Sequence, residues 1–209
     1  GWHKGVLGIV ASRIVDKYYK PTVVISVTEG LGTGSGRSIE GFHLHEAFTS
    51  CSSILDNFGG HKRAAGLRLK DTNIPAFRIA MNEFAKTNLN VEQMVRSLDI
   101  DCEVPLADLD LALVEIIASM EPHGEGNPAP VFCSRGLTVK SLPQVLGRET
   151  IKFWVTDGSR SFSVVGFGMA SLKEAIKLGT KIDIAYSLGI DDWNKAPVVQ
   201  LMLKDVKVL

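Results

Sequence analysis

The stretch from Phe58 to Gly66, FGGHKRAAG in one-letter code, combines residue types that can bind an anion. Gly59 and Gly60 let the backbone adopt positive φ and approach a ligand closely, so neighbouring peptide N–H groups can point at one acceptor. His61 can donate a charge-assisted hydrogen bond, and a lysine and an arginine follow it. We therefore expect an anion site. The residues alone also leave open a tight turn between a helix and a strand.

A second candidate for phosphate contact is Gly36-Arg37-Ser38, because an arginine fork and a hydroxyl can both engage a phosphate. It ends a glycine-rich run that begins at Gly30 and matches neither the G-x-G-x-x-G fingerprint nor the phosphate loop of NTPases. We expect the run itself to be a flexible connection.

The spacing of the histidines, cysteines, acidic residues and serines indicates neither a metal site nor a catalytic nucleophile. The histidines form no H-E-x-x-H motif or cluster, and no C-x-x-C occurs. The carboxylate pairs Asp99/Asp101 and Asp108/Asp110 are better explained by a solvated strand face and by a helix cap with its dipole. No serine or cysteine lies in a recognisable catalytic motif. We expect no metal site and no nucleophile in these residues.

Composition bounds the class of protein. With 209 residues, 45% hydrophobic and 22% charged, the chain is typical of globular domains. It carries no bilayer-length apolar run and no export signal, so we expect a soluble cytoplasmic protein without membrane contact. Cys51, Cys102 and Cys133 fit no zinc pattern and are expected to be reduced and buried.

The net charge of zero hides an asymmetry. Residues 131–209 hold 11 Lys+Arg against 7 Asp+Glu, and the preceding residues hold 12 against 16. A basic half is a modest indication of nucleic-acid contact.

Residues 1–90 alternate between helix and strand patterns, which indicates a small α/β domain. The expected elements are a helix over 5–18, a strand over 22–27, a glycine-rich turn over 29–36, a short strand over 37–39, a helix over 42–58, a strand over 65–69 and a helix over 73–86.

Residues 91–130 read as a linker containing a strand over 98–104 and a short helix that Asp108 caps and that ends near Met120. From 131 to 209 the pattern becomes mostly β. Strands are expected over 131–140, 150–157, 161–167, 181–188 and 197–206, with one helix over 169–178. Three strands, a helix and two strands is the order of an OB-fold barrel.

The barrel half carries cations and aromatic residues that could track phosphates and stack on bases. The candidate DNA contacts are Lys152, Trp154, Arg160, Trp193 and Lys195. Phe153, Phe162 and Phe167 can equally be core residues, since alternate positions of a strand face inward.

FGGHKRAAG resembles the G-G-H-x-x-A-A-G signature of the DHH-associated substrate-binding domain of DHH-family phosphoesterases. Within that family three further stretches, WHKGVLGIVASR from Trp2, GSGRSI from Gly34 and GEGNPAPVF from Gly124, resemble the RecJ-type exonucleases, which degrade single-stranded DNA from the 5′ end. The four motifs occur in the same order over nearly the whole chain.

The resemblance implies that residues 1–90 are the DHH-associated domain and residues 131–209 the OB-fold of such an enzyme. His61 with the Gly59-Gly60 backbone would hold the phosphate next to the scissile bond, assisted by Arg37 and Ser38. Manganese or magnesium would be held by an N-terminal catalytic domain that nothing here matches, so this chain alone is expected to be inactive. Ala64 to Gly66 would keep side-chain bulk low where that domain closes over the substrate.

Two other functions stay open. One is hydrolysis of short oligonucleotides or cyclic dinucleotides, whose phosphodiesterases share the G-G-H signature; the appended barrel argues against it. The other is an interaction module whose barrel binds a single-strand-binding protein or a helicase. Single-stranded DNA is the leading expected partner.

Overall fold

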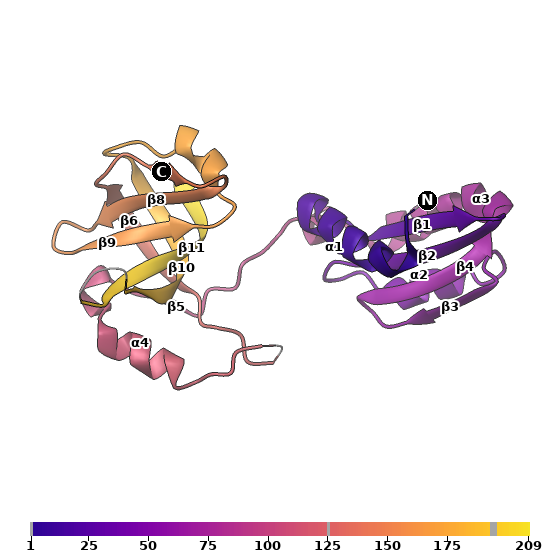
Figure 1. The fold of residues 1–209 in the computed structure, drawn as a ribbon, viewed down its shortest axis with the longest axis horizontal. Helices are drawn as coiled ribbons and strands as arrows, with labels where there is room; N and C mark the ends of the chain where they lie inside the picture. Colours follow the sequence, from indigo (N-terminus) through magenta and orange to yellow (C-terminus); the bar gives the residue numbers. More distant parts are fainter. Residues whose placement is uncertain (1, 125, 193–195) are drawn as a thin grey trace. The chain divides into compact units, whose positions relative to one another are not determined.

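The structure is a computed structural model that describes residues 2–124, 126–192 and 196–209. The chain divides into two compact units, Gly1–Ser97 and Leu98–Leu209 (Figure 1).

The first unit is built on a four-stranded antiparallel sheet in the order β1-β2-β4-β3. Its strands are β1 Thr22–Thr28, β2 Leu31–Arg37, β3 Asn57–Gly60 and β4 Ala64–Lys70, and its helices are α1 Leu7–Tyr18, α2 Leu44–Ser50 and α3 Ile74–Asn88. Phe48 of α2 and Phe77 of α3 pack with Leu67 and Leu69 of β4 in one apolar core. We call the side of the sheet with Leu67 and Leu69 its inner face. The other side, with Gly66 and Arg68, is its outer face.

The glycine-rich run is a strand, and our expectation of a flexible connection was wrong. Gly32, Gly34 and Gly36 of β2 point to the inner face, where a Cβ at Gly34 would lie 2.9 Å from Leu67 Cδ1 and one at Gly36 2.7 Å from Leu44 Cδ2. Neighbouring side chains therefore fill the space that these glycines leave. Thr33, Ser35 and Arg37 of β2 alternate with these glycines and lie on the outer face. There the start of α1 packs against Ser35 and Arg37, so both side chains are half-buried.

The helix expected over 42–58 is also shorter than predicted, because α2 ends at Ser50. Tight turns follow it, with the Cys51 N–H donating to the Phe48 carbonyl and the Ile54 N–H to the Cys51 carbonyl. Strand β3 then begins at Asn57 and pairs with β4. FGGHKRAAG is therefore a β-hairpin rather than a turn from helix to strand.

The second unit is a barrel with the strand order expected of an OB-fold. Its strands are β6 Phe132–Val139, β7 Gln144–Leu146, β8 Thr150–Thr156, β9 Ser161–Gly166, β10 Lys181–Asp191 and β11 Val198–Val208. The ring runs β6-β10-β11-β9-β8 and closes through pairing of β8 with β6, and β7 was not predicted. The helix expected over 169–178 is only a 3-10 turn, Ala170–Glu174. An α/β domain followed by an OB-fold barrel is the architecture that the sequence predicts.

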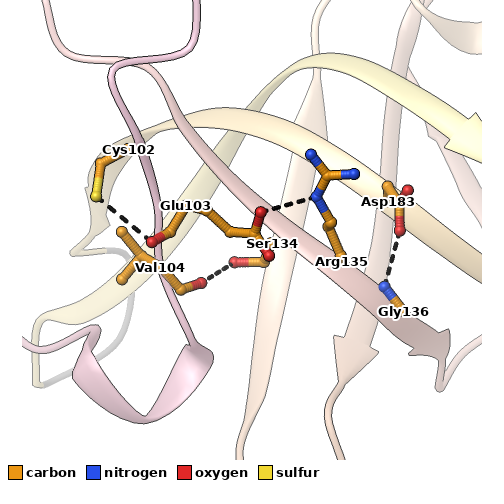
Figure 2. Close-up of polar contacts among 7 residues, drawn as sticks. All are labelled: Cys102, Glu103, Val104, Ser134, Arg135, Gly136 and Asp183. Atoms are coloured by element: carbon orange, nitrogen blue, oxygen red, sulfur yellow. Dashed lines mark hydrogen bonds and ion pairs between the residues drawn. The ribbon is translucent and has the colours of Figure 1, made fainter.

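Residues 98–130 group with the barrel. Strand β5, Cys102–Glu103, pairs in parallel with β6, and Leu106 and Leu109 lie in the barrel's apolar core. Figure 2 shows polar contacts between β6 and the segment that contains β5. Arg135 Nε donates to Glu103 Oε2 at 2.8 Å, and Ser134 Oγ donates to the Val104 carbonyl at 2.6 Å.

Two smaller expectations about this unit were wrong. Helix α4, Leu111–Ala118, is capped by Asp110, whose carboxylate accepts from the Leu113 N–H, whereas Asp108 lies in the preceding 3-10 turn. Cys102 is exposed, while Cys51 and Cys133 are buried as expected. Burial raises the pKa of both buried thiols, which keeps them protonated.

None of the helices in the described ranges is long and apolar enough to cross a bilayer.

Tyr186 gives the barrel a predicted pH dependence. Its hydroxyl lies 2.7 Å from Ser134 Oγ, and because Ser134 donates to Val104, the tyrosine is the donor of that bond. Burial raises the pKa of Tyr186 to about 12, so the unfolded chain loses this proton near pH 10 while the folded chain keeps it. We expect the free energy of unfolding to fall as pH rises from about 10 to 12.

Denaturant unfolding across this range tests the expectation. Tyr186→Phe should lower stability at neutral pH by about 1 kcal/mol, the net value of one hydrogen bond, and should flatten the alkaline fall. Tyr18→Phe, at an exposed ring, should keep it. An unchanged alkaline slope in Tyr186→Phe would contradict the assignment.

Candidate functional site

The predicted anion-binding residues lie at the β3–β4 hairpin and the adjacent end of β2. The His61 N–H donates to the Ala64 carbonyl at 2.8 Å, which closes the His61-Lys62-Arg63 loop. The carbonyls of Arg63 and Lys62 accept from the Ser38 and Leu44 N–H groups at 3.0 and 2.9 Å. These bonds fix the loop beside Arg37, which pairs with Ala64 across the sheet.

The two glycines of the motif serve different purposes. Gly60 has φ 139°, and a Cβ there would lie 2.5 Å from the Ala64 carbonyl oxygen, so the hairpin itself requires glycine. Gly59 has no atom within 4 Å of where its Cβ would be. Nothing within the described chain explains why that residue lacks a side chain.

Arg37 is a half-buried cation whose guanidinium is held in place. Nη1 donates to the Gly36 carbonyl at 2.8 Å and to Ser35 Oγ at 3.2 Å. A Cβ at Gly8 would lie 2.7 Å from Nη2, so the start of α1 leaves room for the fork. Among the described residues no carboxylate forms an ion pair with Arg37. A fixed, uncompensated cation is suited to binding an anion.

His61 and Ser38 differ in what they can offer a ligand. His61 is exposed, and no hydrogen bond or ion pair of its imidazole occurs within the described part of the chain. Ser38 uses its hydroxyl to donate to the Phe42 carbonyl at 2.9 Å and its N–H to donate to Arg63. Both Ser38 donors are thus engaged in holding the surrounding turns, and Ser38 can meet a phosphate only by releasing the Phe42 carbonyl.

The outer face of the sheet beside the hairpin is hollowed. The hollow has a volume of about 470 Å³ and is lined by Thr33, Gly34, Asn57, Phe58, Gly59, Gly66, Leu67 and Arg68. Thr33, Asn57 and Arg68 supply polar side chains, whereas Gly59 and Gly66 expose backbone. Sequence analysis did not identify Thr33, Asn57 or Arg68, because their alignment across three strands depends on the sheet's register.

Lys152 and Trp154 share the outward side of β8, as their spacing of two requires. Lys152 Nζ lies 3.3 Å from Asp191 Oδ2, and Gln200 Nε2 donates to the same carboxylate at 3.2 Å. Lys152 is therefore charge-compensated in this conformation. Trp154 is 44% exposed and is free to contact a ligand.

Phe167 is 66% exposed and lines a hollow of about 550 Å³ together with Lys152, Gln200 and Leu146. Sequence reasoning left Phe167 among the candidate core residues, while Phe153 and Phe162 are buried. It follows the last residue of β9, where alternation no longer decides which side a ring takes. The sequence does carry one indication that Phe167 is exposed, because it stands between Gly166 and Gly168 at the end of a strand.

Arg160, another predicted DNA contact, is not among the described residues that line this hollow. Arg160 lies in the β8–β9 turn, and its Nη1 donates to the Leu109 carbonyl at 3.4 Å. Trp193 and Lys195 lie outside the described residues.

Within the described ranges, no group of three or more His, Cys, Asp or Glu side chains could hold a metal ion. The residues at hand therefore do not fit a catalytic metal, and no step of metal chemistry is assigned to them.

The β3–β4 hairpin with its G-G-H sequence lies in an α/β domain, and an OB-fold barrel follows this domain along the chain. Residues 1–87 match the DHHA1 domain model, and residues 100–205 match the RecJ OB domain model. The chain belongs to the RecJ family.

Individual relatives agree with this assignment. The single-stranded-DNA-specific exonuclease RecJ of Bacillus subtilis is 34% identical over all of this chain, which spans 27% of that protein's length. Crystal structures of RecJ from Thermus thermophilus in complex with Mn²⁺ and with Mg²⁺ are 28% identical to the chain and superpose with TM-scores of 0.80 and 0.79. The chain matches them over 98% of its residues and spans 29% and 31% of theirs.

The difference between the two motif glycines is testable by substitution. Gly60→Ala should lower the free energy of unfolding by about 1–3 kcal/mol, because it strains the backbone and meets the Ala64 carbonyl. Gly59→Ala, in open space, should change it by less than about 0.5 kcal/mol. Denaturant unfolding followed by circular dichroism measures both. Equal losses in the two variants would show that Gly59 also has a structural role.

Proposed function

We propose that this chain is the substrate-binding region of a single-stranded-DNA-specific exonuclease. In this proposal Arg37, His61 and the Gly59-Gly60 backbone hold a phosphate of the DNA next to the bond that is cut. Cleavage runs from 5′ to 3′ and uses manganese or magnesium held by a catalytic domain outside this chain. The proposal rests chiefly on the state of Arg37. Its half-buried guanidinium is held by hydrogen bonds to Ser35 and Gly36, and no carboxylate in the described ranges pairs with it.

The chemistry assigned to these residues is positioning and charge neutralisation. A phosphodiester that meets the Arg37 guanidinium and the His61 imidazole is fixed in one orientation, which removes the entropy cost of alignment from the reaction. The Arg37 charge and the hydrogen-bond donors around it offset the charge that builds on the phosphate oxygens as the bond breaks. Ser38 joins this grip when its hydroxyl turns away from the Phe42 carbonyl.

The barrel supplies sequence-independent contact with the strand. Trp154 and Phe167 present exposed rings on which bases can stack, and base stacking tolerates any sequence. Lys152 becomes available to a phosphate if the phosphate competes with Asp191 for it. A single-strand-binding protein or a helicase is a further candidate partner, which pull-down with and without nuclease treatment would test.

Binding of a fluorescent oligodeoxynucleotide to the chain tests the proposal. Anisotropy should rise on binding at low salt, more for single-stranded than for duplex DNA. The logarithm of the binding constant should fall with the logarithm of salt concentration by about 0.7 for each phosphate contact. Absence of binding at low salt, or equal binding of duplex, would overturn it.

Substitutions of Arg37 test whether this residue contacts a phosphate of the DNA. Arg37→Ala should weaken binding about tenfold or more, the value of one charge-assisted contact, and reduce the salt dependence. Arg37→Lys should restore only part of the affinity, because an ammonium keeps the charge but loses the fork. Arg78→Ala is the matched control and should bind normally, because Arg78 lies on α3 and lines a different pocket, together with Ile25 and Phe77 of the inner core. Circular dichroism confirms that each variant is folded.

A further inference from the structure

The register of the first sheet arranges its outer face in rows that run across the strands. The first row holds Arg37 and Ala64, and the second holds Ser35, Gly66 and Gly59. The third holds Thr33, Arg68 and Asn57. Successive rows on one face are two residues apart, which is on the order of 7 Å in a strand.

The second row has no side chains where β4 pairs with β3. Gly66 and Gly59 are direct partners across the strand pair, and both are exposed. A Cβ at Gly59 would touch nothing, and one at Gly66 would come no closer than 3.7 Å to the Gly34 carbonyl. Neither glycine has positive φ. Neither conformation nor packing inside the described chain thus requires glycine at these two positions.

These two glycines contrast with those of β2. Gly32 and Gly34 sit where leucine side chains of β4 fill the space of a Cβ, so the fold itself explains them. At Gly59 and Gly66 the missing side chains instead leave a flat peptide surface two strands wide. Such a surface has room for a planar ring at van der Waals distance, which any Cβ would lift away.

The rows on either side determine what kind of ring fits. On one side lies the Arg37 row with the His61 loop, the proposed phosphate grip. On the other side lies Arg68, whose guanidinium forms no hydrogen bond or ion pair in the described part of the chain, flanked by the Thr33 hydroxyl and the Asn57 amide. A planar ring between a phosphate site and a row of hydrogen-bonding side chains has the layout of a nucleotide.

We propose that Gly59 and Gly66 form a platform for one nucleobase of the bound strand, and that Arg68 with Asn57 contacts the edge of that base. This deepens the proposed function and rests on it, because the base is the one attached to the phosphate held at Arg37 and His61. The platform selects an unpaired base, because a base inside a duplex is stacked on both faces and uses its edge for pairing, which leaves neither free for the glycines or for Arg68.

The test compares DNA with and without bases. The probes are an oligothymidylate and a chain of the same length made of abasic sugars, and the measured quantity is the ratio of their dissociation constants. Gly66→Val should reduce this ratio about fivefold, the lower end of what base stacking supplies, by lifting the ring off the backbone. It should leave thermal unfolding and the affinity for the abasic chain unchanged, because valine suits an extended strand and a Cβ at this position makes only an ordinary van der Waals contact.

Arg68→Ala is a second variant at an exposed side chain that cannot disturb the core, and it should also reduce the ratio. Lys70→Ala is its matched control, a cation on the same strand and face one row further on, and it should not. An unchanged ratio in Gly66→Val and Arg68→Ala overturns the platform. If Arg37→Ala still weakens binding in that case, the phosphate grip stands without it; if Arg37→Ala has no effect either, both proposals fail.

Discussion

The two-residue period of the extended strand determines most of what the first unit can do. In β2 and β4 one set of alternating positions packs against leucine and phenylalanine side chains, and the other set faces outward. The same glycine-rich segment therefore supplies a tightly packed inner face and, at its end, an outward-facing Arg37. A shift of one residue in the β2–β4 register would bury Arg37 and expose the core, which is why the register is strongly specified.

Backbone pairing rather than side-chain contact holds the candidate site together. The loop at His61 is fixed by carbonyls that accept from Ser38 and Leu44, and Ser38 secures the turn toward Phe42. Side chains that can bind a ligand are then left unengaged at His61 and Arg68, as far as the described residues extend. In the barrel the arrangement is different, because Lys152, Asp191 and Gln200 already form a connected polar group on its surface. In the first unit the Arg37 guanidinium is therefore already held in place before any ligand arrives. In the second unit an anionic ligand at Lys152 has to compete with Asp191.

The sequence was sufficient for the order of the two domains and for most of their strands, but not for the contacts that individual residues make. Strands β8 to β11 follow from alternation and β-branched residues, which are local signals. Strand β2 was missed because glycine has a low strand propensity. The side chains of Leu67 and Leu69, which fill the space at Gly34 and Gly32, lie 33 and 37 residues further along the sequence. The opposite roles of Gly59 and Gly60 depend on φ and on the Ala64 carbonyl, neither of which a motif reveals. The pairing of Lys152 with Asp191 likewise joins residues that are far apart along the chain.

Gly8 illustrates how stability and function can conflict within one helix. Replacing a glycine inside a helix by alanine ordinarily strengthens the helix by about 1 kcal/mol, so a designer who seeks a more heat-resistant protein would choose this position early. Here the added methyl group would press on Nη2 of Arg37 at 2.7 Å and turn the guanidinium from its direction. Screens that score folding alone would rank such a change as an improvement. The glycine in α1 is thus part of the electrostatics of the sheet beneath it, although no ligand needs to touch it.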